Sequence, residues 1–207
     1  MGLYERIAHE RQPTLILCRM TYFRGVLPSV NKSPDTLEII EYPDYLSKDR
    51  PFGVSASSLV IKRAALESVG RWSEDRIFDV MQDQELVLRL GAAGKAIRII
   101  SPSTVLHRLH EGQVVNHVPP YLKTLDAMIL RERAGQYPGG RERRFDRAAF
   151  FGGLVLHWTR RAFRQRLFAP GLRIFIQHFP FFCAAAIKRA RALALGRQPV
   201  VTIKLPG

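Results

Sequence analysis

The chain has 207 residues, of which 46% are hydrophobic and 24% are charged. This composition is typical of a globular protein, excludes a collagen-like or low-complexity chain, and suits one domain with an appendage. The formal net charge is +14, but residues 1–120 are nearly balanced, so the excess in residues 121–207 predicts an anionic partner for that part.

The two cysteines, Cys18 and Cys183, lie far apart, and neither belongs to a Cys-x-x-Cys pair. A disulfide framework or a zinc site is therefore not expected. The first residues, MGLYERIAHERQ, contain no apolar signal-peptide core. These features favour a cytoplasmic protein, and the basic second part adds an expected peripheral position at the inner face of the membrane.

The first 120 residues alternate between strand-like and helix-like segments. Residues 3–10 are expected to be the end of a helix. A short helix is expected at 63–70, and Gly70 should end it because glycine readily adopts a positive φ. A further helix begins near Asp79, the expected N-cap with Gln82 as its capping-box partner, and runs to Gly94. Apolar runs predict strands at 14–22, 37–42, 57–62, 95–100 and 104–110. The strands at 14–22 and 57–62 are expected to be buried.

The character of the sequence changes after Pro119-Pro120. An amphipathic helix is expected at 120–135, followed by a linker rich in Gly and Arg at 135–144. Two basic helices are then expected, at 145–166 and 171–195. The basic helices are expected to be separated by a break at 169–171. We place the domain boundary near 118–120, giving domains at 1–118 and 119–207.

Three motifs within residues 52–117 are together similar to the second half of family-2 glycosyltransferases of the GT-A fold. They read KRAALESVG at 62–70, QDQELVLRL at 82–90 and HRLH at 107–110. The family typically has Glu-Asp at the start of the second motif and Tyr-Arg-x-His in the third, so the chain departs from it at Gln82 and His107. Asp-x-Asp, which holds the metal and the donor diphosphate in this family, occurs nowhere in the sequence.

The resemblance implies an α/β fold: a partial GT-A (Rossmann-like) domain of sheet and helices, followed by an α-helical basic tail. It implies transfer of a sugar from a nucleotide-sugar donor to a glycan or lipid-linked acceptor of the cell envelope. A divalent metal, Mg²⁺ or Mn²⁺, is expected only with a complete donor site. Because the donor-binding half is not recognised, the chain is expected to be truncated or to work with a separate donor half, and to be inactive alone.

Asp83 is the expected catalytic base, because the resemblance aligns it with the Asp of the family's Glu-Asp motif. An inverting sugar transfer needs a carboxylate to take the proton of the acceptor hydroxyl. Asp83 is also expected near the start of a helix, where the dipole favours an anion. The alternative is a solvated aspartate at a helix start.

Three further side chains are expected to meet the acceptor. Gln82 can both donate a hydrogen bond to a sugar hydroxyl and accept one from it. Glu85 either meets the acceptor or forms an ion pair with Arg89 at i+4, which is the structural alternative. Trp72 could stack on a sugar ring, as could Phe52, although either could equally be a core anchor.

Arg108 and His110 alternate with Leu109 and are expected on one strand face. Arg108 suits a diphosphate leaving group, and His110 aligns with a late histidine that resembles a metal ligand. The alternative is that both are exposed polar residues at a strand end. His107 and His117 have weaker claims.

The basic tail interleaves arginines with aromatic residues, as interfacial helices on anionic membranes do. Residues 168–187 have the length of a membrane span, but they contain Arg173, Gln177 and Pro180, so we expect them to lie on the membrane. A packed helical appendage is the alternative.

Two rival functions stay open: a non-catalytic binding or scaffolding module, and, ranked last, a nucleic-acid-binding protein. No nucleic-acid motif is recognised, so that partner is not expected.

Overall fold

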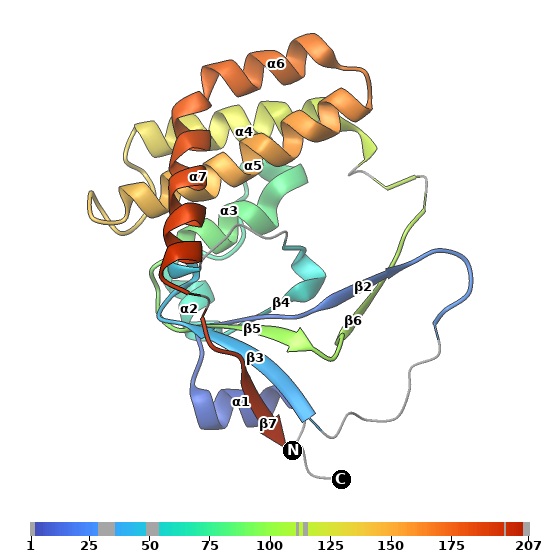
Figure 1. Ribbon diagram of the computed structural model, residues 1–207, viewed down its shortest axis with the longest axis vertical. Helices are drawn as coiled ribbons and strands as arrows, with labels where there is room; N and C mark the ends of the chain where they lie inside the picture. Colours follow the sequence, from blue (N-terminus) through green and yellow to red (C-terminus); the bar gives the residue numbers. More distant parts are fainter. Residues whose placement is uncertain are drawn as a thin grey trace.

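The computed structural model describes residues 3–28, 36–48, 54–110, 112–113, 116–196 and 198–204. It has a mixed α/β architecture, with helix α1 (Leu3–Arg11) on one side of a mixed sheet and most other helices on the opposite side (Figure 1). The α/β class expected from the sequence is therefore confirmed.

The main sheet has five strands in the order β4-β1-β5-β3-β7. Their bounds are β4 Leu59–Ile61, β1 Leu15–Leu17, β5 Ala96–Ser101, β3 Thr36–Tyr42 and β7 Val201–Lys204. The β1–β5 pair is parallel and the other three pairs are antiparallel. Beyond β1 and β5 the chain continues into a second parallel pair, β2 (Met20–Phe23) and β6 (Val105–Arg108), which reaches out from the main sheet (Figure 1).

Alternating side chains of the central strands feed two hydrophobic clusters, one on each face of the sheet. Ile16 and Ile97, opposite each other in the parallel pair, lie in the cluster that includes Ile7 of α1. Leu15 and Leu17 point the other way, into the larger cluster under the helices. The strands therefore fit between two layers, which explains their nearly continuous apolar sequences.

Short helical segments connect the strands. They are η1 (Tyr45–Ser47), η2 (Ala56–Ser58), α2 (Arg63–Ser68), the 3₁₀ segment η3 (Arg76–Met81) and α3 (Gln82–Arg89). Four longer helices complete the fold: α4 (Val118–Arg133), α5 (Arg144–Arg164), α6 (Phe168–Gln177) and α7 (Phe179–Ala194).

The proposed boundary at 118–120 coincides with the start of α4, but a shared core crosses it. Leu17 and Leu88 from the first part lie in the same buried cluster as Leu125, Phe151 and Trp158 from the second. In addition, β7, which the sequence did not predict, pairs with β3 at the edge of the main sheet. The second part is thus an integral layer of the fold as well as a basic segment.

Several element boundaries differ from the predictions in the first part of the chain. The strand expected at 14–22 is divided into β1 and β2, and β4 is a half-buried edge strand where a buried one was expected. Asp79 is not an N-cap: Asp75 caps η3 by accepting a hydrogen bond from the Ile77 N–H over 3.1 Å, and α3 begins directly afterwards. Gly70, with a φ of +78°, does follow α2 as expected.

The helix break expected at 169–171 is wrong. Those residues form the first turn of α6, where Pro170 needs no intrahelical N–H partner. The chain instead turns just before α6, where Arg166 has a φ of +61°, and again at His178 between α6 and α7. Within the described residues, no single helix is long and apolar enough to cross a membrane; α6 and α7, bent by 71°, meet that criterion only as a pair.

Candidate functional site

Asp83 lies in the first turn of α3, largely shielded from solvent. Its Oδ1 accepts a hydrogen bond from the Gln84 N–H over 2.8 Å, and the Ala56 N–H also stabilises the carboxylate. Ion pairs among the described residues do not include Asp83, so backbone N–H groups are what stabilise its charge within that part of the chain.

Burial raises the pKa of Asp83 to about 6, because desolvation penalises the charged form more than the backbone hydrogen bonds favour it. A carboxylate in this range is still mostly ionised at neutral pH and is a stronger base than an exposed aspartate. Asp83 can thus accept a proton near neutrality, which is the property required of the predicted base.

Two tyrosines that the sequence analysis did not single out are close enough to sense the Asp83 charge. Burial, and secondarily Asp83, raises the pKa of Tyr45 and of Tyr121. The Tyr121 ring stacks on Trp158, with ring centroids 4.0 Å apart. Because Tyr121 and Trp158 come from α4 and α5, the surroundings of Asp83 depend on the second part of the chain, which no local motif around Asp83 could indicate.

The two neighbours of Asp83 that were expected to bind an acceptor differ in exposure. Gln82 is half-buried, and its Nε2 donates to Asp79 over 3.2 Å. Glu85 is fully buried, and both of its carboxylate oxygens accept from Arg89 Nε, over 2.9 and 2.8 Å. The i+4 pairing considered as the alternative for Glu85 is therefore confirmed, and its carboxylate is directed away from solvent.

The Glu85–Arg89 pair also supports the loop that carries Trp72. Arg89 donates to the carbonyl oxygens of Val69 and Arg71, and the Arg71 bond measures 2.6 Å. Trp72 follows directly and is 37% exposed. It is thus a surface aromatic on a loop anchored to α3, compatible with contact to a ligand, whereas Phe52 lies outside the described residues.

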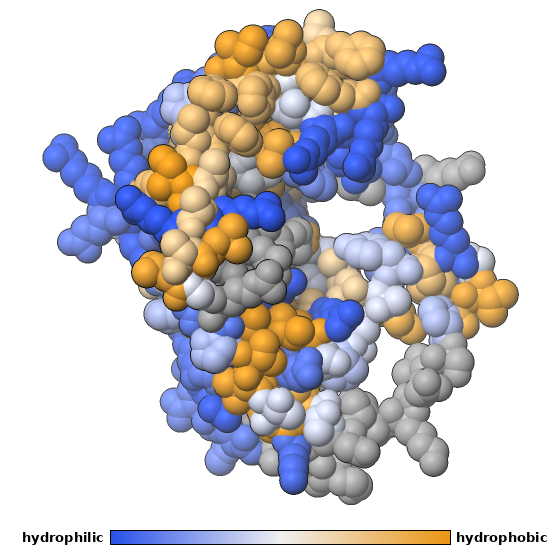
Figure 2. All heavy atoms as spheres, in the orientation of Figure 1, coloured by the Kyte–Doolittle hydropathy of each residue, from blue (hydrophilic) through white to orange (hydrophobic). Residues whose placement is uncertain are grey.

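Arg108 and His110 do not join Asp83 through any hydrogen bond or ion pair of the described residues. Strand β6 ends at Arg108, so His110 lies beyond the strand that was expected to hold both on one face. The Arg108 guanidinium lies over the Phe23 ring, 5.5 Å from its centroid, and His110 is exposed. In Figures 1 and 2, an opening separates the helical layer from the β2–β6 pair that carries Arg108.

The described residues do not assemble a metal site: among them, no three His, Cys, Asp or Glu side chains converge. His110 offers one imidazole, and its neighbour Glu111 lies outside the described part. The expected Mg²⁺ or Mn²⁺ thus remains a prediction that depends on a complete donor site.

No known protein family, curated protein or solved structure shows significant similarity to this chain. The fold and the site define it as a mixed α/β protein with a shielded carboxylate at the start of a helix.

Proposed function

We propose that the chain is the acceptor side of a glycosyltransferase with a GT-A-like architecture. It would transfer a sugar from a nucleotide-sugar donor to a glycan or lipid-linked acceptor of the cell envelope. The observation that carries the proposal is Asp83, a shielded carboxylate without an ion pair among the described residues, whose pKa is raised to about 6.

In the proposed step, Asp83 takes the proton of the acceptor hydroxyl while the acceptor oxygen forms a bond to the anomeric carbon. The bond from that carbon to the diphosphate oxygen breaks, and the nucleoside diphosphate leaves with the bonding electrons. Gln82 and Trp72 are the side chains we assign to acceptor contact. The raised pKa of Asp83 implies that the rate rises with pH through about 6 and then levels off.

The donor side is expected to be supplied from outside this sequence, because no Asp-x-Asp occurs in it. The test therefore adds the purified chain to membranes and cytosol from cells lacking the gene, with a panel of radiolabelled nucleotide sugars. The expected result is that one donor labels a glycan or lipid fraction only when the chain is added. No donor-dependent labelling with any nucleotide sugar would overturn the proposal.

Two variants make this experiment specific. Asp83→Asn removes the base but keeps an oxygen for the backbone N–H groups, so labelling should fall by about 100-fold or more. Glu74→Gln changes an exposed carboxylate that has no hydrogen bond or ion pair among the described residues and should leave labelling unchanged. Equal labelling by the parent and Asp83→Asn would exclude Asp83 as the base.

A peripheral position at the membrane is the second part of the proposal. Phe168, Leu172 and Ile176 of α6 are 61%, 51% and 64% exposed. Figure 2 shows hydrophobic side chains gathered at the end of the molecule where Figure 1 places α6. Arg166 and Arg173 are exposed nearby in the sequence. Exposed apolar side chains flanked by cations suit the interface of an anionic membrane.

The second candidate function is a non-catalytic binding module, which the lack of an Asp-x-Asp in the sequence favours. It predicts retention of a glycan ligand without turnover in the labelling experiment. Titration calorimetry with nucleoside diphosphates and Mn²⁺ separates the proposals further, since tight metal-dependent binding to this chain alone would contradict an incomplete donor site.

A further inference from the structure

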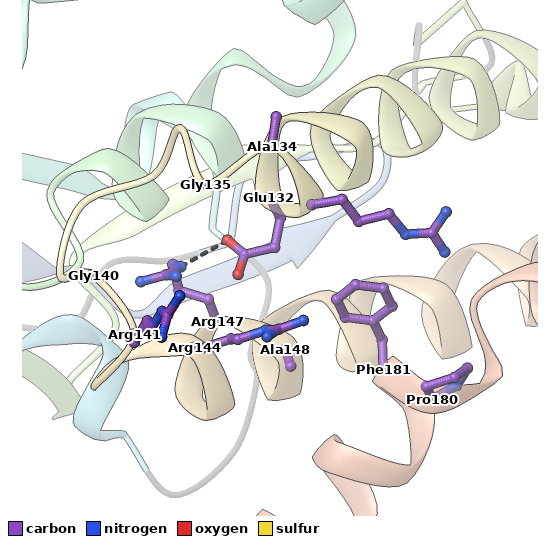
Figure 3. A pocket seen from close by; sticks show the side chains of 11 residues that line it. Glu132, Ala134, Gly135, Gly140, Arg141, Arg144, Arg147, Ala148, Pro180 and Phe181 are labelled. Atoms are coloured by element: carbon purple, nitrogen blue, oxygen red, sulfur yellow. Dashed lines mark hydrogen bonds and ion pairs between the residues drawn. The ribbon is translucent and has the colours of Figure 1, made fainter.

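A cavity of about 660 Å³ lies where the end of α4, the turn at 135–143, the start of α5 and the start of α7 meet (Figure 3). Four arginines contribute to its lining: Arg133, Arg141, Arg144 and Arg147. Glu132 is the one acidic residue among the lining residues. We call this cavity the arginine pocket.

The charges in the arginine pocket are not balanced. Arg147 Nε donates to Glu132 Oε2 over 2.7 Å, and each side chain is only 4% exposed, so this pair is neutral overall and forms a fixed part of the wall. Arg133, Arg141 and Arg144 are exposed and form no ion pair among the described residues. Three positive charges therefore remain around one concave surface, where they repel each other without an anion.

Among the described residues, the Arg141 and Arg144 side chains form no hydrogen bond, and Arg133 forms only weak ones. The hydrogen bonds of Arg133 are long, at 3.4 Å to the Gln177 carbonyl oxygen and 3.4 Å to His178 Nδ1. Arg144 is the first residue of α5, so the positive end of a long helix dipole adds to the same field. In Figure 3, the Arg144 side chain extends toward Phe181, and the dashed line marks the Arg147–Glu132 pair.

The backbone leaves room for a ligand. Gly135 and Gly140 line the pocket with φ values of +70° and +55°, and a Cβ built at either position would meet no atom within 4 Å. Phe181 supplies an aromatic surface beside the cations, with the Arg133 guanidinium 5.9 Å from its ring centroid. The pocket thus combines open space, cations and one apolar wall.

We propose that the arginine pocket binds the diphosphate group of an organic diphosphate. A diphosphate ester carries two to three negative charges near neutral pH, which matches the three unpaired arginines better than a single carboxylate would. Guanidinium groups bind phosphate oxygens through paired, charge-assisted hydrogen bonds, and Phe181 can contact the organic part. This inference goes beyond the proposed function and does not depend on Asp83.

The diphosphate can belong to a soluble nucleotide or to a lipid-linked carrier, and titration calorimetry of the full chain distinguishes the two. The probes are inorganic pyrophosphate, uridine diphosphate and farnesyl diphosphate, each at low and moderate salt. Binding of pyrophosphate is expected, weakening as salt rises. Tighter binding of farnesyl diphosphate indicates a lipid carrier, and tighter binding of uridine diphosphate indicates a nucleotide.

Charge-matched variants test the location. Arg141→Gln and Arg144→Gln should each lower pyrophosphate affinity by about tenfold or more, since each removes a charge-assisted contact. Arg189→Gln removes the same charge from an exposed position on α7 outside the pocket lining and should have little effect. Because Arg141 and Arg144 are exposed, the variants should fold, which circular dichroism verifies. No binding by the parent chain, or equal losses in all three variants, would overturn the proposal.

Discussion

Arg89 Nε lies 2.9 and 2.8 Å from the two carboxylate oxygens of Glu85, and the Glu85 side chain is 1% exposed. The same arginine donates to the carbonyl oxygens of Val69 and Arg71. One buried ion pair therefore fixes α3 against the loop after α2, and this loop carries Trp72. Glu85 is a positioning residue for the candidate site.

Glu85→Gln should destabilise the protein by about 3–5 kcal/mol, because it leaves Arg89 partly buried without its counter-charge. Urea unfolding followed by circular dichroism measures the change. Glu74→Gln is the matched control, since Glu74 is exposed, and its effect should stay within about 0.5 kcal/mol. Equal stabilities of the two variants would contradict the positioning role and would favour the earlier hypothesis that Glu85 contacts the acceptor.

Asp83→Asn should make the protein more stable at pH 8 but not near pH 4. The folded-state pKa of Asp83, about 6, lies above its ordinary value of 3.8, so the folded protein binds this proton more tightly than the unfolded chain. The corresponding stability is fully present below pH 3.8 and is lost as pH rises through 6. Asn stays neutral at every pH and escapes that loss, which amounts to about 3 kcal/mol at 1.36 kcal/mol per pH unit.

The measurement is urea unfolding of the parent and Asp83→Asn at several pH values from 4 to 8. Asp79→Asn serves as the control, because Asp79 is exposed and its variant should follow the parent curve. A difference between Asp83→Asn and the parent that does not change with pH would mean that Asp83 is not desolvated. If Asp83→Asn gains stability at pH 8 and also loses labelling activity, Asp83 behaves as a functional group that lowers the stability of the folded protein.

Gly152→Ala should disrupt the contact between α5 and α7. A Cβ at residue 152 would lie 2.0 Å from the Phe181 carbonyl oxygen, a backbone atom that cannot move without shifting α7. The expected loss is about 3 kcal/mol or more, above the usual cost of overpacking, as measured by thermal unfolding. Gly112→Ala is the control, because its nearest neighbour, His110 Nδ1, is 3.6 Å away. A tolerated Gly152→Ala would show that α7 packs more loosely than described.

The sequence predicted local elements better than their packing. The run at 37–42 and the Gly70 stop were found because strand composition and a positive φ are encoded within a few residues. In contrast, β7 forms only because β3 offers a free edge, and its own sequence, Val201–Lys204, is too short to be distinctive. Pairing across such a distance in the chain leaves no periodic signal.

The same limit applies to the site. Asp83 could be singled out from a motif, and its place in the first turn of a helix was expected from that motif. The desolvation that raises its pKa was not, because it arises from side chains brought in by other elements. The arginine pocket was missed for a similar reason: Arg133 lies at the end of α4 and Arg144 at the start of α5, so a charge count alone cannot show that they converge.

The exposed face of α6 should bind anionic membranes. The full-length chain should float with vesicles containing phosphatidylglycerol at low salt and be released as salt rises. Apolar contact and charge both contribute: burial of a large apolar side chain is worth about 1.5–3 kcal/mol, and each nearby basic residue adds about 1 kcal/mol before screening. The whole chain is needed, because α5 supplies Phe151 and Trp158 to the central core and deletion of the tail would unfold it.

The double variant Phe168→Ser/Ile176→Ser should lower vesicle binding by about 100-fold, since it removes two side chains that are 61% and 64% exposed and contribute little to the core. Leu130→Ser is the matched control, because Leu130 is equally exposed at 61% but lies on α4. Equal flotation of the double variant and the parent would show that α6 does not meet the membrane. Binding that ignores salt would instead indicate that the bent α6–α7 pair enters the bilayer, because charges in water are screened by salt and buried apolar helices are not.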